Sequence, residues 1–306
     1  MKNFGFGLMR LPTTDPSNAG AIDVEQVKKM VDLFIEKGFT YFDTAWMYCG
    51  FQSEPTVKEG LTSRYSRDKF TLASKLHNGF FNSLEDRDTV FNQQLRKTGV
   101  EYFDYYMLHG IESGSLPKYE QFDCFSWLKD KKEKGLVKTA GISFHATAEL
   151  LDEILTKYPF LEFVQLQINY LDWDSQWIQS KACYDVAVKH GKWVTVMEPV
   201  KGGTLAKVPA EVEELFKAHD PSLSPASWAI RFAASLPEVK MVLSGMSSLA
   251  QMEDNLSFME NFKPLTEEEK AMVMKAGEII NSRIAVPCTG CSYLSLIHIS
   301  EPTRRR

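Results

Sequence analysis

The sequence predicts an α/β protein built as a single (β/α)8 or TIM barrel with extra C-terminal helices. Eight short β-rich runs alternate with longer amphipathic segments in a chain of 306 residues, and this rhythm is typical of a closed barrel of parallel strands. Most runs are apolar on both faces, as strands are when helices cover one side and the barrel core covers the other. The runs span residues 6–11, 40–45, 70–75, 105–110, 138–144, 163–169, 193–199 and 241–247.

A doubly wound open sheet is the competing arrangement for this alternation. Its phosphate-binding fingerprint, G-x-G-x-x-G, is absent from the chain. The length would also allow two domains, but α/β barrels of this size commonly form one. We therefore expect one barrel domain over residues 1–285.

The segments between the strands carry helix start and stop signals. The first amphipathic segment begins after Asp23, whose side chain suits an N-cap, and Gly38 ends it. Residues 146–159 and 175–192 repeat this scheme, and the second of them closes at Gly191. The apolar residues of the first segment recur at helical spacing: Val27, Met30, Val31 and Phe34.

The pattern loosens after the seventh strand. Residues 201–225 form an excursion punctuated by glycine and proline before the eighth strand. Beyond that strand, residues 248–262 and 266–284 are predicted to be helices, and Thr266 caps the second. These two helices are the expected C-terminal addition to the barrel.

Composition excludes several classes of protein. Hydrophobic residues make up 44% and charged residues 25% of the chain, and the net charge of −5 gives no reason to expect nucleic acid or an anionic membrane as partner. No apolar run approaches the ~20 residues of a membrane helix, and the N-terminal stretch lacks the apolar region of a signal peptide. Three of the five cysteines are scattered, which is typical of reduced thiols, so we expect a cytoplasmic protein.

Chemically useful side chains occur where three neighbouring strands are expected to end. Asp43 ends the second strand, Lys75 the third and His109 the fourth. Tyr48 lies in the loop just after Asp43. Each residue alone has an ordinary structural explanation, such as a helix cap or a solvated charge. Active sites of barrels lie at this end of the strands, however, and an apolar barrel has little reason to place four polar groups there.

These four side chains together suit the reduction of a carbonyl group. A free tyrosine titrates near pH ~10, too high for ready proton donation at neutral pH. A nearby lysine favours the phenolate and lowers the pKa of Tyr48, while a carboxylate paired with the lysine keeps it charged. Tyr48 then acts as general acid, His109 orients the carbonyl oxygen, and a cofactor delivers hydride to the carbon.

The chain resembles the aldo-keto reductase superfamily along nearly its whole length, as far as Cys291. The resemblance rests on the segments FDTAWMY, ASK, YMLHG, GIS, VQLQINY, MEPVKGG and VLSGMSSLAQMEDN. The chain is similar in particular to bacterial oxidoreductases that append a ferredoxin-like iron–sulfur segment. The resemblance implies an NAD(P)-dependent aldo-keto reductase with the catalytic residues Asp43, Tyr48, Lys75 and His109 in the roles given above.

The resemblance also implies a nicotinamide cofactor held at the barrel mouth without a Rossmann motif. Ser143 and Gln165 match the positions that hold the carboxamide. The loop from Lys201 matches the segment that closes over the pyrophosphate, where glycines let the backbone approach phosphate closely; without the barrel context it could equally be a simple glycine turn. The other implied cofactor-binding residues are Met197, Pro199, Gly202, Gly203, Gly245, Ser247, Gln251 and Asn255.

Several positions depart from the pattern of the family. Met197 stands where many members stack an aromatic ring, and Phe144 replaces an asparagine that often contacts the carboxamide. The lysine and arginine that usually bind the 2′-phosphate of NADP are Gly245 and Gln251 here, and a phosphate dianion without basic partners is poorly bound. Since the superfamily favours NADP while these residues do not, we expect NADP or NAD, with a slight preference for NADP.

The C-terminal stretch contains a second motif. Cys288 and Cys291 form C-T-G-C, half of a [4Fe–4S] motif, and a zinc site would likewise need further ligands. The relatives continue with the missing cysteines, so we expect residues 286–293 to be the start of a truncated iron–sulfur segment and residues 294–306 to be a non-native tail. A genuine truncated variant is the alternative. The cluster is expected only in an intact, longer chain.

The predicted function is reduction of aldehyde or ketone carbonyls of small molecules by NAD(P)H. Two alternatives stay open: a nicotinamide-binding regulatory subunit with little turnover, and an electron-transfer oxidoreductase that uses the missing cluster and a redox partner. Trp46 and Met47, with His145 and Tyr170, are candidates for the substrate pocket and favour an apolar or aromatic carbonyl. Neither nucleic acid nor a membrane is an expected partner.

Overall fold

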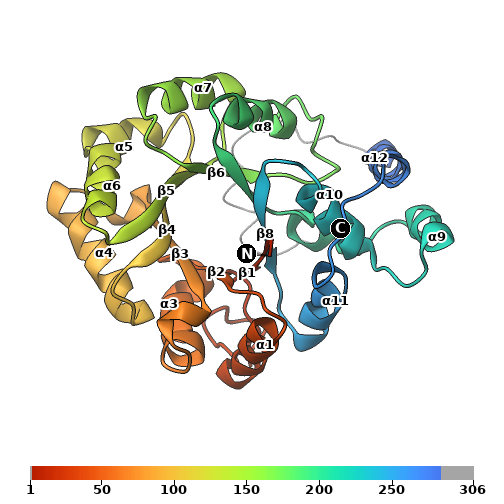
Figure 1. Cartoon of the computed structure of the whole chain (residues 1–306), viewed down its shortest axis with the longest axis horizontal. Coiled ribbons are helices and arrows are strands. Elements are labelled where there is room, and N and C mark those ends of the chain that lie inside the picture. The colour runs from red at the N-terminus through yellow and green to blue at the C-terminus, as the bar shows by residue number, and fades with distance from the viewer. Residues whose placement is uncertain (1, 284–306) are drawn as a thin grey trace.

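In the computed structural model, which describes residues 2–283, the strands close into a barrel. Each strand pairs in parallel with the next one along the chain, and β8 closes the ring against β1. Helices surround this ring (Figure 1), which confirms the predicted single (β/α)8 domain. The strands are β1 (Phe4–Gly7), β2 (Tyr41–Asp43), β3 (Thr71–His77), β4 (Phe103–Ile111), β5 (Val137–Phe144), β6 (Phe163–Gln167), β7 (Trp193–Met197) and β8 (Val239–Gly245).

All eight predicted strands are present, but some of their ends are shifted. The first predicted run, 6–11, extends too far, because Leu8 and Leu11 are buried in the turn after β1 and continue the apolar pattern beyond the strand. β3 continues two residues past Lys75, and β4 continues past His109. These two longer strands bring additional side chains to the end of the barrel where the predicted catalytic residues lie.

Helices with the predicted caps cover the outside of the barrel. Asp23 Oδ1 accepts a hydrogen bond from Gln26 N at 3.0 Å at the start of α1, and Thr266 forms a capping box with Glu269 at the start of α12. None of the helices within residues 2–283 is long and apolar enough to cross a membrane. The α-helices are α1 (Val24–Glu36), α2 (Tyr48–Phe51), α3 (Ser53–Val57), α4 (Leu84–Thr98), α5 (Leu116–Gln121), α6 (Cys124–Glu133), α7 (Ala148–Lys157), α8 (Ser180–Lys189), α9 (Ala210–His219), α10 (Pro225–Ala234), α11 (Leu249–Met259) and α12 (Glu267–Ser282).

Two segments differ from their predictions. α8 begins five residues later than predicted, because Gln179 has a left-handed backbone with φ of 56° that a helix does not continue. Residues 201–225 are more ordered than the predicted excursion, since they contain the 3-10 helix η4 (Lys201–Ala206) and α9. Pro225 then starts α10, at a position where the missing N–H would have no helical partner.

Aromatic side chains fill the barrel at the N-terminal ends of its strands. The rings of Phe163 and Trp193 stack with centroids 4.7 Å apart, and Tyr105 meets both edge-on. A Cβ on Gly141 would approach the Phe163 ring to 2.5 Å, so only glycine leaves room for this ring. Because this packing closes one end of the barrel, the other end, at the C-terminal ends of the strands, is the one left for a ligand. We call that end the mouth.

Candidate active site

The structure brings the four predicted catalytic residues together at the mouth. Asp43 is the last residue of β2, Lys75 lies in β3, His109 lies in β4, and Tyr48 begins the short helix α2 that follows β2. The centroid of the Tyr48 ring is 4.8 Å from Lys75 Nζ and 6.0 Å from the centroid of the His109 ring. The ring of Tyr48 therefore lies beside both Lys75 and His109.

Lys75 and Asp43 form a buried ion pair. Lys75 Nζ lies 2.6 Å from Asp43 Oδ1 and donates a second hydrogen bond to Thr44 O at 2.8 Å. Burial by itself lowers the pKa of Lys75, but the charge of Asp43 and the neighbouring Tyr48 outweigh burial, so the pKa is raised and the ammonium stays charged. Asp43 therefore holds the positively charged ammonium of Lys75 in a fixed position below the phenol.

Burial changes the predicted titration of Tyr48. Desolvation raises the pKa of the phenol, and the charge of Lys75 lowers it by less. The net lowering expected from the sequence is therefore wrong for the protein without a bound ligand, although the predicted effect of Lys75 is present. At neutral pH the phenol carries its proton, and Lys75 is placed to stabilise the phenolate after that proton has left.

An unusual backbone positions Tyr48. The three residues that follow it, Cys49, Gly50 and Phe51, all have positive φ, at 52°, 58° and 71°. Non-glycine residues adopt this conformation at a cost, and such residues cluster at functional sites. The Cys49 thiol, which lies 3.4 Å from the carbonyl oxygen of Leu8, anchors this turn to the segment after β1.

His109 is a neutral imidazole at the mouth. Burial lowers its pKa well below the ordinary value of 6.5, and the positive charge of Lys75 adds to this effect. Its Nδ1 is buried and makes no hydrogen bond within residues 2–283. A neutral ring has one N–H donor and one acceptor. His109 can therefore donate a hydrogen bond to a substrate oxygen while the ring itself stays uncharged.

A buried polar network, which was not predicted from the sequence, supports the strand that carries Lys75. Gln94 Nε2, from α4, lies 2.7 Å from Glu54 Oε1, 2.9 Å from Ser74 Oγ and 3.1 Å from Lys75 O. Gln94 Oε1 accepts from Tyr106 OH at 2.5 Å. The available signal was Ser74, a polar residue inside an otherwise apolar run. This network fixes the backbone of β3 behind the site.

Ser143 and Gln165 are neighbours, as predicted for a carboxamide-binding pair. They are register partners on β5 and β6, and both are buried. Gln165 Nε2 lies 3.6 Å from Met197 Sδ, whereas Gln165 Oε1 is buried without a hydrogen-bond partner within the described part of the chain. A buried acceptor of this kind requires a donor, and the amide N–H of a nicotinamide carboxamide is a suitable one.

The glycine-containing loop after β7 leaves space for a ligand, but its lysine, Lys201, forms an ion pair with Asp172. Gly202 and Gly203 have positive φ, and a Cβ on Gly203 would meet no atom within 4 Å. Lys201 Nζ lies 2.6 and 2.5 Å from the two carboxylate oxygens of Asp172. The positive charge of Lys201 is therefore offset by Asp172 in this structure. Pro199 lies just before this turn.

The loop after β8 and the start of α11 are held by their own hydrogen bonds. Gln251 Oε1 accepts from Ser247 N at 2.8 Å, and Asn255 Nδ2 donates to Ser244 Oγ at 2.9 Å. Gly245 ends β8 and is exposed. These contacts give the four predicted residues of this region (Gly245, Ser247, Gln251 and Asn255) a defined arrangement beside the mouth.

Arg10 lies between these two loops and was not predicted. Its Nη2 is 3.8 Å from the position of a Cβ on Gly202, and its side chain is 3.7 Å from that of a Cβ on Gly245. The Arg10 carbonyl accepts from Ser247 Oγ at 2.8 Å, and its guanidinium makes no ion pair or hydrogen bond within residues 2–283. The signal in the sequence was a cation among the apolar residues of the predicted run 6–11.

The residues proposed for a substrate pocket separate into two groups. Trp46 contacts Phe80 with ring centroids 6.3 Å apart, and Lys97 Nζ lies 3.6 Å from the centroid of the Trp46 ring. His145 is exposed at the end of β5, with Nε2 3.3 Å from Ser143 Oγ. Tyr170, by contrast, is only 2% exposed and belongs to the core, so it offers little surface to a substrate.

The predicted metal ligands, Cys288 and Cys291, lie outside the described residues, as do the predicted segments 286–293 and 294–306. Across residues 2–283, no group of three or more histidine, cysteine, aspartate or glutamate side chains could hold a metal ion. The three remaining cysteines, Cys49, Cys124 and Cys183, are buried free thiols.

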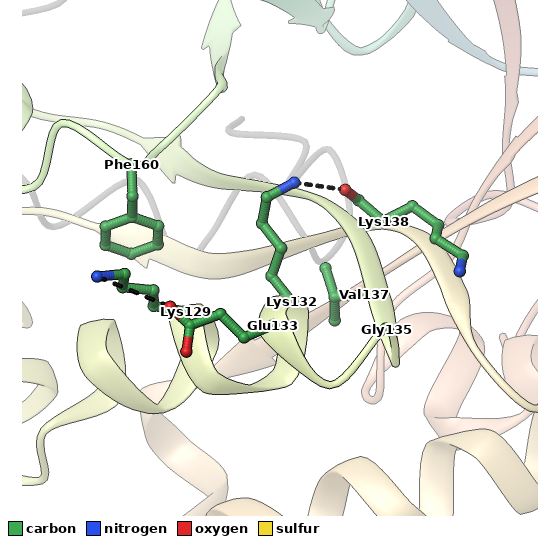
Figure 2. Close-up of a pocket in the computed structure, with 7 residues that line it drawn as sticks. All are labelled: Lys129, Lys132, Glu133, Gly135, Val137, Lys138 and Phe160. Atoms are coloured by element: carbon green, nitrogen blue, oxygen red, sulfur yellow. Dashed lines mark hydrogen bonds and ion pairs between the residues drawn. The ribbon is translucent and has the colours of Figure 1, made fainter.

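A surface pocket lies away from the predicted site. Figure 2 shows it between α6 and the start of β5, at the opposite end of that strand from the mouth. Lys132 donates to Lys138 O at 2.7 Å and pairs with Glu162 at 2.9 Å. None of the predicted site residues lines it; its lining residues are Lys129, Lys132, Glu133, Gly135, Val137, Lys138 and Phe160.

A parallel barrel with a tyrosine, a lysine–aspartate pair and a neutral histidine at its mouth defines the chain as an NAD(P)-dependent oxidoreductase. Residues 3–278 match the Aldo/keto reductase family, and the chain belongs to that family.

Several known proteins are similar to this chain. It is 24% identical over 298 residues to the uncharacterized oxidoreductase YqkF of Bacillus subtilis, a match that covers 87% of this chain and 89% of that protein. It is 24% identical over 256 residues to an L-galactose dehydrogenase of Arabidopsis thaliana, covering 77% of this chain and 78% of the other.

Two solved structures share the fold. An aldo-keto reductase from Bacillus halodurans in its holo form superposes with a TM-score of 0.71 at 24% identity and covers 94% of both chains. An aldo-keto reductase from Klebsiella pneumoniae in complex with NADPH gives a TM-score of 0.70 at 16% identity, over 91% of this chain and 90% of that one.

Proposed function

We propose that the protein reduces aldehyde or ketone carbonyls with Tyr48 as the general acid. The observation that carries this proposal is the buried pair of Lys75 and Asp43 below the phenol, with Lys75 Nζ 4.8 Å from the centroid of the Tyr48 ring. The bound nicotinamide supplies a hydride to the carbonyl carbon. The Tyr48 proton goes to the carbonyl oxygen, so the product is an alcohol.

Each member of the set has one task. Tyr48 Oη donates the proton, and the charge of Lys75 stabilises the phenolate that forms. Asp43 holds Lys75 charged and in place. His109, kept neutral by burial and by Lys75, donates an N–H to the carbonyl oxygen and orients it.

The cofactor-binding residues fit a nicotinamide dinucleotide along the same mouth. Gln165 Oε1, which lacks a partner in the described part of the chain, and the Ser143 hydroxyl would hold the carboxamide. Met197, beside Gln165, would pack on the ring. The open space over Gly203 would admit a phosphate close to the backbone. The residues at the start of α11 would contact the adenosine part.

Arg10 supports a preference for NADP over NAD. The positions that usually carry basic residues are Gly245 and Gln251, but the guanidinium of Arg10, which has no partner within residues 2–283, lies beside Gly245 and Gly202. A guanidinium is well suited to bind a phosphate dianion in two-point contact. Arg10 thus offers, from the segment after β1, the positive charge that the loop after β8 lacks.

The experiment that tests this function is steady-state oxidation of NADPH and NADH, followed by absorbance, with a reactive aldehyde and a quinone. Wild type and Tyr48→Phe are compared, and Tyr158→Phe, on the outer helix layer, is the matched control. We expect turnover in wild type and control and a loss of about 10²-fold or more in Tyr48→Phe. Wild-type turnover that survives in Tyr48→Phe would contradict the role of Tyr48.

The same assay separates the two alternatives. A folded protein that binds NADPH tightly but reduces neither compound would favour a nicotinamide-binding regulatory subunit. Turnover that requires a C-terminus carrying all cluster cysteines would favour electron transfer to a redox partner, since Cys288 and Cys291 supply only two of the ligands of a [4Fe–4S] cluster.

A further inference from the structure

The mouth contains a second imidazole that the proposed mechanism does not use. His77 is the last residue of β3 and is the register partner of His109 on β4. Because side chains alternate along a strand, His77 lies on the same inward face as Lys75 and nearer the rim. The centroids of the two imidazole rings are 5.3 Å apart, with their planes at 80°.

A backbone contact determines which nitrogen of His77 carries the proton. Gly79 N–H donates to His77 Nδ1 at 3.0 Å. Nδ1 is therefore an acceptor, and in the neutral ring the proton is on Nε2. Burial lowers the pKa of His77, and the charge of Lys118 adds to this effect, so the ring is neutral at neutral pH. Nε2 is an uncharged donor whose identity is set by the protein.

This donor has no partner in the part of the chain that the structure describes. His77 Nε2 makes no hydrogen bond within residues 2–283 and lies 3.8 Å from the position of a Cβ on Gly110. Gly110 has a φ of 68° and no side chain, so the space beside the donor stays open. The His77 ring also contacts Phe80, with ring centroids 5.7 Å apart.

Phe80 belongs to an aromatic wall at the rim. It contacts Trp46 with ring centroids 6.3 Å apart and Phe51 with centroids 5.8 Å apart. A substrate at this rim therefore meets aromatic rings directly beside two imidazoles, those of His77 and His109. Next to apolar rings, an N–H donor that a bound ligand leaves without an acceptor costs binding free energy. Such a donor therefore discriminates against molecules that cannot accept its hydrogen bond.

We infer that His77 is a specificity-determining residue, and that it selects carbonyl compounds with a second, uncharged acceptor oxygen on the neighbouring carbon, as in vicinal dicarbonyls. This inference rests on the proposed function. His109 meets the oxygen that is reduced, and His77 Nε2–H meets the second oxygen. Two rings from adjacent strands, 5.3 Å apart, suit oxygens on neighbouring carbons. A carboxylate gains less, because the His77 ring carries no charge.

The test compares two substrates in four proteins. Diacetyl is a vicinal dicarbonyl, and butyraldehyde has a single oxygen; kcat/KM for each is measured with NADPH. The proteins are wild type, His77→Phe, which keeps a ring against Phe80 but removes the donor, and His77→Gln, which restores an N–H donor. The fourth is His190→Phe, a control whose histidine pairs with Asp152 on the outer helices.

In His77→Phe we expect the ratio of kcat/KM for diacetyl over butyraldehyde to fall about tenfold, the effect of one hydrogen bond in an apolar setting. His77→Gln should recover most of that ratio, and His190→Phe should leave it unchanged. The difference in intrinsic reactivity between the two substrates cancels, because only the change of the kcat/KM ratio between proteins is compared. An equal loss on both substrates, or an unchanged ratio in His77→Phe, would overturn the role of His77.

A second measurement separates this role from the proposed function. In histidine-labelled protein loaded with NADP⁺, diacetyl should shift the ¹⁵N resonance of His77 Nε2, and butyraldehyde should not. The resonance is assigned by its loss in His77→Phe. Absence of turnover with both substrates would count against the proposed function, whereas absence of the diacetyl-specific shift would overturn the inference on His77.

Discussion

Lys75 Nζ lies 2.6 Å from Asp43 Oδ1, and both side chains are almost fully removed from solvent. Such a pair connects β2 to β3 below Tyr48. Buried ion pairs contribute little net stability compared with apolar replacements, because both charges lose their hydration. The pair is therefore better explained by the chemistry at Tyr48 than by the stability of the barrel.

Asp43→Asn should destabilise the protein strongly. Loss of the carboxylate leaves the buried ammonium of Lys75 uncompensated, so we expect the free energy of unfolding in urea to fall by about 3–5 kcal/mol. Asp43→Asn combined with Lys75→Met should recover part of the loss, because no buried charge remains. A double variant whose loss equals the sum of the two single losses would show that the side chains do not interact in this way.

The rate of carbonyl reduction should be insensitive to pH around neutrality. Burial raises the pKa of Tyr48 above its ordinary 10.0, so the proton donor is lost only as pH rises beyond that value. Burial and Lys75 lower the pKa of His109 well below 6.5, so its neutral form is lost only as pH falls far below that value. A kcat/KM profile with an inflection near pH 6.5 that disappears in His109→Gln would contradict this assignment.

Arg10→Gln should weaken the use of NADPH more than that of NADH. We expect the KM for NADPH to rise about tenfold, which corresponds to ~1.4 kcal/mol, with a much smaller change for NADH, because a guanidinium contributes mainly by binding phosphate. Arg96→Gln removes an exposed arginine of α4 and is the control. Equal changes for the two cofactors would place Arg10 at a phosphate that both of them share.

Gln94→Ala should destabilise the protein and loosen β3 behind the site. The substitution leaves Glu54, Ser74 and Tyr106 with buried polar groups that lack their partner. We expect a loss of about 2–4 kcal/mol, because each unsatisfied buried group carries its own desolvation penalty. The neighbouring Gln93→Ala, measured by the same urea unfolding, should change stability by less than about 0.5 kcal/mol. Similar losses in both variants would assign the effect to helix α4 and not to the network.

Much of the barrel could be predicted from local patterns. Asp23 and Thr266 act as helix caps where their positions predicted, since capping depends on a few neighbouring residues. The errors lie at element ends. The first strand stops at Gly7 because apolar residues serve the core in a turn as well as in a strand, and periodicity alone does not distinguish the two.

The sequence by itself determined the eightfold alternation, the caps and the residue types available at the ends of the strands, because these depend on spacing and chemistry along the chain. Only the tertiary structure decided the distances and the burial. It paired Lys201 with Asp172, brought Arg10 beside Gly245, and set His77 next to His109. It also decided the sign of the pKa shift at Tyr48, because desolvation depends on every atom packed around the phenol and outweighs the one charge that spacing could predict.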